Sequence, residues 1–418
     1  MLKLFSPQSF PIHPAPTTEI GIQIPLQMTQ KPAPTWQILC APLKGICNNI
    51  GPIPSTGNHP IEFTFLDQLY SLIYFHVEEY DSARALFEDL NDPQLSGLEG
   101  LPCGTIRRST FSDAINTRGL PQMLAVFHQL SHKAGKLVGD KYPELGPLNV
   151  HDGSLIEATL SMEWADYTNT TNKAKAHLTF HLNSGMPTQI SLTDGKGAER
   201  PVADHQLEPG QTGVMDRGYQ DHRRFDDWQA SLKHFVCRIR RNTTYTLCEH
   251  LPILAGTNIV FDAIVHLGDD AHRTRYPVRL IGVRKGRTTL WIATSRFDLT
   301  AEQIATIYRL RWQIETFFAW WKRHLNVYHL IARSHHGVFM QLLAGLISYL
   351  LLVIYCFGRD GACPSLTHLR HLRRRLRQER ASVVSSTGFV VFCGIGFMMV
   401  ARWELTSPFG LYACPKVE

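Results

Sequence analysis

Among its 418 residues the chain has nine cysteines, but no two of them form a C-x-x-C pair. The lack of such pairs argues against a zinc site and against a disulfide framework. The start of the chain also lacks the charged segment and the unbroken apolar core of a signal peptide. We therefore expect a cytosolic protein whose thiols stay reduced.

Positive charge exceeds negative charge only modestly. The chain has 42 lysines and arginines against 36 aspartates and glutamates, a formal net charge of +6. This mild basicity suits a polyanionic partner, but many unrelated soluble proteins share it, so it excludes little. The apolar content of 44% is enough for a globular interior, and 418 residues exceed one ordinary core. We expect two or three domains.

The first sixty residues have few features of a folded segment. They hold eleven of the 24 prolines of the chain. Because proline removes a backbone donor and interrupts helices and central strands, such a stretch is not expected to hold long helices. We predict that residues 1–62 are extended or poorly ordered.

In residues 63–146 apolar side chains recur at helical spacing, which predicts a helical domain. Arg107, Arg108 and Arg118 fall near a predicted turn between two of its helices. These short basic helices could bind DNA, or they could form a helical bundle whose basic residues face solvent. No recognition-helix signature is sharp enough to name base contacts, so both interpretations stay open at this point.

Two later segments each place one carboxylate just past an apolar run. Asp152 ends one predicted strand and Asp216 ends another. Gly153 and Gly218 follow closely, and we expect them to turn the chain. Open α/β sheets build their sites at such strand ends.

A predicted helix late in the chain gathers polar groups of mixed charge on one face. An α-helix advances about 100° per residue, so Tyr308, Arg311, Glu315 and Lys322 fall within an arc of roughly 60°. A carboxylate flanked by cations and a ring suits a metal ion bound beside a nucleic-acid backbone. An ordinary row of surface salt bridges has the same pattern. Together with two strand-end aspartates, this glutamate could hold a pair of Mg²⁺ ions, which prefer oxygen ligands.

Together these segments resemble the DDE transposases of bacterial insertion sequences. The four polar residues of the predicted helix match, without a gap, the Tyr-(2)-Arg-(3)-Glu-(6)-Lys signature of one group of that family. Asp152 in His-Asp-Gly-Ser and Asp216 in Met-Asp-Arg-Gly-Tyr match the contexts of the family's first and second aspartates. The likeness runs from about residue 66 to about residue 352.

The resemblance implies a fold and a function. The fold would be α/β, a ribonuclease-H-like catalytic core with a β-rich insertion, plus an N-terminal helical domain that binds DNA. The core would occupy residues 147–236 and 297–358, the insertion residues 237–296, and a basic C-terminal region residues 359–418. The function would be to cut DNA at the ends of an insertion sequence and to join the 3′-hydroxyl ends to target DNA by two-metal phosphoryl transfer.

The resemblance also implies catalytic residues and partners. Asp152, Asp216 and Glu315 would hold two Mg²⁺ ions, for which Mn²⁺ could substitute. Terminal inverted repeats and target DNA would be the partners, and the DNA-bound complex would contain a homodimer. The protein would act in the bacterial cytoplasm at the nucleoid, without a membrane. A DNA-binding relative that no longer catalyses, and a metal nuclease that cuts without joining, remain alternatives.

Four residues of the predicted helix are expected to bind DNA. Tyr308, Arg311 and Lys322 would hold phosphates near the cut, and arginine suits a bidentate phosphate contact better than lysine. Trp312 could stack on a displaced base, a contact typically worth about 1–3 kcal/mol per base. It could equally pack in the core.

Two segments near the end leave alternatives open. Residues 337–358 are apolar and long enough to span a bilayer, but the resemblance makes this segment a buried core helix. Residues 369–377 are the most basic of the chain, with leucines at helical spacing. This pattern predicts an amphipathic helix whose cationic side could lie on phosphates, on an acidic partner or in water.

Overall fold

The protein is described by a computed structural model that covers residues 34–54, 61–92, 98, 100–102, 106–159, 161–168, 170–197 and 199–386, with the short strands β11 (Phe392–Gly394) and β12 (Phe397–Met399). These residues belong to one compact unit that begins at Pro34. The part of the predicted disordered segment before residue 34 lies outside the described residues.

The helix α1 (Thr35–Cys47) contradicts the prediction of an extended segment up to residue 62. It contains Pro42, which removes one helical hydrogen bond. Trp36, Leu39 and Leu43 recur on one helical face and are fully buried. Burial of this face offsets the ~3 kcal/mol that an interior proline costs a helix. The prediction was wrong here because it weighed the number of prolines and missed the apolar face.

The helices that follow α1 share one apolar core with a long apolar helix. They are α2 (Phe65–Glu78), α3 (Ala83–Leu90), α4 (Arg108–Thr117) and α5 (Leu120–Val138). Helix α10 (His335–Asp360) contacts α1, α2, α4 and α5, and all of them share one continuous apolar core with the central sheet. The predicted helical character of this region is therefore present, but the helices do not have a core of their own.

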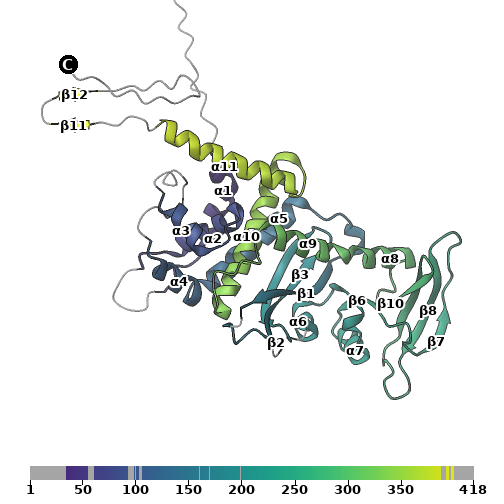
Figure 1. Cartoon of the computed structure of the whole chain (residues 1–418). Helices are drawn as coiled ribbons and strands as arrows, with labels where there is room; N and C mark the ends of the chain where they lie inside the picture. Colours follow the sequence, from purple (N-terminus) through teal and green to yellow (C-terminus); the bar gives the residue numbers. More distant parts are fainter. Residues whose placement is uncertain are drawn as a thin grey trace, which may run out of the picture. The chain divides into compact units, whose positions relative to one another are not determined.

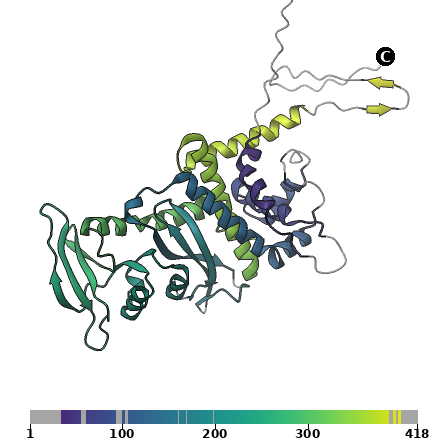
Figure 2. The ribbon, with the colours of Figure 1, turned by 180° about the vertical axis from the view of Figure 1, so that it is seen from behind.

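Helix α10 lies among the N-terminal helices (Figures 1 and 2). Among the described residues it is the one helix long and apolar enough to cross a membrane, and 89% of its apolar window is buried inside the protein. Its polar Gln341 is fully buried and bonded to backbone: the side-chain amide donates to His329 O at 2.7 Å and its oxygen accepts from Ile331 N at 2.9 Å. The interpretation as a buried core helix is confirmed.

The centre of the sheet is formed by three parallel strands, β1 (Leu148–Ala158), β5 (Thr212–Met215) and β6 (His234–Arg238). Antiparallel strands continue it beyond β1: β3 (Thr171–His181), then β4 (Met186–Asp194) and β2 (Asp166–Thr168) paired with β3. This mixed sheet with flanking helices is consistent with a ribonuclease-H-like core.

The predicted β-rich insertion is an extension of the same sheet. Strand β10 (Thr288–Thr294) pairs with β6, and β9 (Val278–Lys285), β8 (Ile259–Leu267) and β7 (Tyr245–His250) follow in that order. These strands form one end of the sheet, at the right in Figure 1. Because β10 pairs directly with a core strand, the insertion adds a continuous edge to the sheet.

Helices cover both faces of the sheet. On one face α7 (His222–Ala230) packs Phe225 flat on Phe235 of β6, with ring centroids 4.2 Å apart. On the other face α8 (Ala301–Leu310) contacts β5, β6 and β8. Successive side chains of a strand point to opposite faces, so Val236 belongs to the core under α8 and Phe235 to the core under α7.

The predicted continuous signature helix is divided in two at Arg311, into α8 and α9 (Trp312–His324). Arg311 keeps helical dihedrals, φ −50° and ψ −34°. Backbone bonds of three-residue span replace the four-residue pattern there, from Arg311 N to Tyr308 O and from Ile314 N to Arg311 O. The chain is therefore tightened at the junction, and the expectation of one regular helix is corrected.

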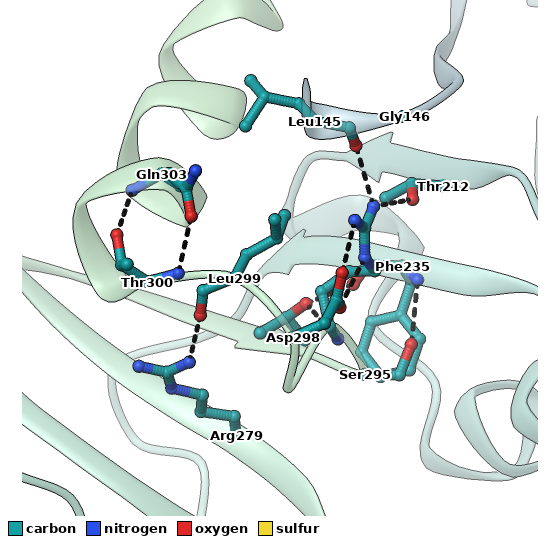
Figure 3. A network of polar contacts seen from close by, with 12 residues as sticks. Leu145, Gly146, Thr212, Phe235, Arg279, Ser295, Asp298, Leu299, Thr300 and Gln303 are labelled. Carbon is teal, nitrogen blue, oxygen red and sulfur yellow. Dashed lines mark hydrogen bonds and ion pairs between the residues drawn. The ribbon is translucent and has the colours of Figure 1, made fainter. Parts of the chain in front are cut away.

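A polar network fixes the loop that leads into α8 (Figure 3). The Arg296 guanidinium donates to Asp298, to Leu145 O at 3.0 Å and to Thr212 Oγ1 at 2.8 Å. In the same region Arg279 of β9 donates to Leu299 O at 2.5 Å. These bonds tie the start of α8 to the sheet, so the helix that carries Tyr308 is anchored to the strand that leads to Asp216.

Candidate active site

Asp152 and Asp216 lie at the same level on neighbouring strands. In the parallel pairing of β1 with β5, Val150 is opposite Val214. Asp152 lies two residues beyond Val150 in β1, and Asp216 lies two residues beyond Val214, just past the end of β5. Neighbouring strands are about 4.8 Å apart. The sheet register therefore places the two aspartates at the same end of the paired segment.

The two aspartates differ in their local structure. Asp216 follows the last residue of β5, and its carboxylate accepts from Gly218 N at 2.7 Å at the start of the short helix η3 (Arg217–Tyr219). Asp152 lies inside β1, which continues to Ala158 because β3 stays paired with it. The prediction that Gly153 turns the chain is therefore wrong. β1 continues past the end of β5 because it stays paired with β3.

Arg311 is the cation between two of the predicted carboxylates. One guanidinium nitrogen, Nη2, forms an ion pair with Glu315, and the other, Nη1, lies 4.0 Å from Asp152 Oδ2. The side chains of Arg311, Asp152 and Glu315 are 15%, 26% and 32% exposed, so the cluster is partly shielded but open to solvent. The four-residue spacing of the predicted helix face thus produces a real contact.

Tyr308 precedes Arg311 by three residues, and the charge of Asp216 acts on its hydroxyl. Burial raises the pKa of the Tyr308 hydroxyl; a hydrogen bond with Arg311 and the charge of Arg238 act in the opposite direction, and the charge of Asp216 raises the pKa further. For Arg311 burial acts to lower the pKa, but the bond to Glu315 and the neighbouring charges outweigh it, and the pKa is raised. The guanidinium therefore stays charged, and it contacts Glu315 and lies close to Asp152.

The donor set fits a hard divalent cation in its chemistry, because all three groups are carboxylates. In this conformation, however, no three His, Cys, Asp or Glu side chains of the described residues are close enough together to hold a metal ion. The positive charge between Asp152 and Glu315 is the Arg311 guanidinium. One carboxylate oxygen of Glu315 is therefore paired with Arg311.

Lys322 lies apart from the Arg311 cluster. Its side chain is buried, and Nζ donates to Leu155 O of β1 at 2.5 Å and lies 5.6 Å from the centre of the Tyr328 ring. Burial lowers the pKa of its ammonium to about 8. It also lines a cavity of about 700 Å³ with Arg323, Tyr328 and other residues. Lys322 thus joins α9 to β1 three residues beyond Asp152.

Trp312 is 63% exposed, although it follows Arg311 directly. The alternative that it packs in the core is therefore excluded. Its ring is available to a ligand beside the carboxylates.

Sequence analysis missed a buried polar chain beside Asp152. Thr179 donates to Gln206 Oε1 at 2.5 Å, and His151 Nδ1 lies 2.9 Å from the Thr179 hydroxyl. His151 is buried, burial lowers its pKa to about 4, and its Nε2 has no hydrogen-bond partner among the residues that the structure describes. The histidine was visible in the sequence, but only the pairing of β1 with β3 reveals that it is buried.

Comparison with known proteins gives one family. Residues 144–351 match the family described as "Transposase DDE domain". The chain is 29% identical over 234 residues to a probable transposase for insertion sequence element IS5377 of Geobacillus stearothermophilus, an alignment that covers 54% of this chain and 62% of that protein. It is 26% identical over 299 residues to a putative transposase for insertion sequence element IS4SA of Synechocystis, covering 70% and 82%. A putative transposase of Sinorhizobium fredii is 27% identical over 201 residues, covering 46% and 56%.

Proposed function

Because the chain belongs to the family of DDE transposases, we propose that it cuts DNA at the ends of an insertion sequence. It then joins the freed 3′-hydroxyl ends to target DNA. One observation carries the proposal: Arg311 forms an ion pair with Glu315 of α9 and lies 4.0 Å from Asp152 of β1, the strand that pairs in parallel with the strand leading to Asp216. A row of surface salt bridges on one helix would not bring Asp152 of β1 to this place.

Asp152, Asp216 and Glu315 would hold two Mg²⁺ ions, with Mn²⁺ as a substitute. Bound divalent ions would supply an activated water and stabilise the leaving oxygen. The chain's own part is to hold the carboxylates in place. The parallel register of β1 and β5 fixes the two aspartates, and the network around Arg296 fixes the helix pair that carries Glu315.

Arg311 has two alternative partners in this proposal. In the structure it pairs with Glu315. A DNA phosphate offers the guanidinium a bidentate partner of the same kind. When Arg311 turns to that phosphate, Glu315 becomes free to bind a metal ion. Through Arg311, DNA binding would then favour metal binding by the carboxylates.

The other residues of the signature would hold DNA close to the cut. Tyr308 would contact a phosphate next to Arg311, and the exposed Trp312 would stack on a base. Lys322 would add positive charge to the phosphates, and its bond to Leu155 O would also keep α9 in register with β1. We propose further that residues 63–146 contribute to DNA binding and that two copies of the chain act together on two ends, in the bacterial cytoplasm.

The proposal is tested by cleavage of DNA that carries the sequences flanking the gene. Purified chain with Mg²⁺ is expected to cut at an inverted repeat and to join the 3′ end to a second duplex. Glu315→Gln should abolish both reactions and leave DNA binding intact. Glu302→Gln, the same change in the first turn of α8, serves as the matched control and should retain activity. Cleavage by the Glu315→Gln protein would refute the assignment, and cleavage without joined products would favour a nuclease.

A further inference from the structure

Helix α11 (Leu366–Ser386) is held to the N-terminal helices by its apolar side and by ion pairs. Leu369, Leu372 and Leu376 are buried. Three of its arginines bind acidic residues at the ends of α2 and α3 and in the loops that follow them. The pairs are Arg373 with Glu79 at 2.5 Å, Arg377 with Glu78 at 3.3 Å, and Arg380 with Asp89 at 3.1 Å and Asp92 at 3.7 Å. The acidic partner foreseen for this basic helix is therefore, in part, the chain itself.

Two arginines of the same helix are not used in this way. Arg370 and Arg374 are exposed and, within the described part of the chain, make no ion pair or side-chain hydrogen bond. They lie four residues apart, one helical turn, and therefore point to the same side. The packing of α11 thus gives one row of arginines acidic partners within the described part of the chain, and it leaves Arg370 and Arg374 exposed to solvent.

Arg370 and Arg374 line a groove of about 500 Å³ on the surface of α11. We call it the α11 groove, and its lining residues are Glu79, Arg370, Arg373, Arg374, Arg377, Gln378 and Ala381. Four arginines face one glutamate in this groove, so it is strongly cationic. It shares Glu79 and Arg377 with the cavity that Lys322 and Arg323 of α9 line together with Glu78 and Asp81. The groove therefore begins beside the helix that carries Glu315.

The composition of the groove decides what kind of partner it fits. Protein interfaces gain most of their affinity from a few aromatic or large apolar side chains and arginines in a desolvated centre. The α11 groove has no aromatic side chain and only one small apolar residue, Ala381. Interfaces with nucleic acid are polar and positively charged, and guanidinium groups bind phosphate oxygens in pairs. The lining therefore suits a phosphate backbone better than an acidic protein.

We propose that the α11 groove binds the sugar–phosphate backbone of duplex DNA without reading its sequence. Arg370 and Arg374 each contact a phosphate, while Arg373 and Arg377 keep the helix fixed on α2. The bound duplex is a continuation of the DNA that lies along α9. This inference rests on the proposed function for the identity of the polyanion, but it concerns a surface that the cleavage chemistry does not use.

The test measures binding of a fluorescent 40-base-pair duplex of arbitrary sequence, without divalent ions, at several NaCl concentrations. Each phosphate contact adds about 0.9 to the slope of log affinity against log salt. Arg370→Gln with Arg374→Gln is therefore expected to weaken binding and to lower the magnitude of the slope by about 2. The same loss should appear with a second duplex of unrelated sequence.

Two further variants separate a groove from a general effect of charge. Arg84→Gln with Arg273→Gln removes two exposed arginines elsewhere, paired with Glu88 and Asp270, and should leave the slope within about 0.5 of the wild-type value. Arg370→Lys with Arg374→Lys keeps both charges and should restore the slope, which also shows that the glutamine variant is folded.

An unchanged slope in the Arg370→Gln, Arg374→Gln protein would overturn the inference. So would an equal change in the Arg84, Arg273 control, or binding of polyglutamate as tight as that of the duplex. The outcome is independent of cleavage. A protein that cuts DNA but shows no groove effect refutes this inference alone. A protein that shows the groove effect but never cuts refutes the proposed function alone.

Discussion

Two arginine–carboxylate pairs in this molecule differ in how far they are buried. One lies in the sheet away from the candidate site, here called the scaffold, and the other lies in the candidate site. In the scaffold Arg279 binds Asp262 through two hydrogen bonds of 2.7 and 2.8 Å and also donates to Leu299 O. Both side chains are buried, 9% and 2% exposed. In the site Arg311 pairs with Glu315 while both side chains remain partly open to solvent, and Asp152 competes for the same guanidinium at 4.0 Å.

The difference indicates which pair can change partners. The carboxylate of Asp262 is buried, so any movement of Arg279 would leave a buried charge without compensation. Glu315 and Arg311 are both reached by water, and each has an alternative partner of suitable charge, a metal ion for one and a phosphate for the other. The scaffold pair should therefore govern stability, and the site pair should govern binding.

The largest expected effect is on stability, from Arg279→Met. Removing one member of a buried pair costs about 3–5 kcal/mol of unfolding free energy, whereas Arg311→Met should cost less than about 1 kcal/mol because its pair is partly exposed. Urea unfolding followed by circular dichroism measures both. In the double variant Arg279→Met, Asp262→Leu most of the loss should be recovered. Equal losses for Arg279→Met and Arg311→Met would break the comparison.

The scaffold should also respond to acid through His76. This ring is fully buried between Leu325 O, 2.5 Å from Nδ1, and Gln341 O, 2.9 Å from Nε2. Burial lowers its pKa to about 4 from the ordinary 6.5. The unfolded chain therefore binds more protons between these values, and stability falls as the pH drops from 6.5 to 4, by up to about 3 kcal/mol.

His76→Gln tests this dependence by its slope. The variant should be less stable than the wild type at pH 7 but should lose about 3 kcal/mol less on acidification to pH 4. Urea unfolding at several pH values gives the comparison. The same pH slope in both proteins would show that the ring does not titrate as a buried neutral group.

A smaller effect is expected for the exposed ring of the site. Trp312→Ala should change the unfolding free energy by no more than about 0.5 kcal/mol, because the side chain is mostly exposed. It should weaken binding of DNA with an unpaired base at the end by about 1–3 kcal/mol, as stacking on an aromatic side chain does. Fluorescence anisotropy with frayed and fully paired duplexes measures the difference. If Trp312→Ala lowered the unfolding free energy without weakening DNA binding, the role of Trp312 would be structural.

Some of this architecture could be predicted from the sequence, for local reasons. The contact of Arg311 with Glu315 follows from helical spacing, and the strands that present Asp152 and Asp216 follow from apolar runs. The buried nature of α10 follows from its composition together with the resemblance. Each of these depends on residues that are near one another in the chain.

The rest depends on contacts between distant segments. Whether Arg311 also lies near Asp152 depends on the register of α8 and α9 against β1, which no local pattern encodes. Lys322 could not be predicted as buried, because its partner Leu155 is 167 residues away. The same holds for Arg373 of α11, whose partner Glu79 is 294 residues away. The number of prolines gave a wrong prediction for α1, because this helix is buried by helices that are distant in the sequence, among them α10 and α11.

The smallest expected effect concerns the exchange of partners between Arg311 and Glu315 in the candidate site. If Arg311 and a metal ion compete for Glu315, DNA should raise the Mn²⁺ affinity of the wild-type chain about tenfold, a coupling of about 1.4 kcal/mol. In Arg311→Met the affinity without DNA should already be high, and DNA should add little. Arg309→Met, a change of the neighbouring arginine, should keep the wild-type coupling. Equal coupling in Arg311→Met would mean that the pair does not exchange.

The most direct measurement of the central claim is the number of Mn²⁺ ions bound per chain in the presence of end-containing DNA, counted by electron paramagnetic resonance. Our account predicts two ions for the wild type and the loss of at least one in each of Asp152→Asn, Asp216→Asn and Glu315→Gln. If all three variants bound as many ions as the wild type, the three carboxylates would not share a metal centre.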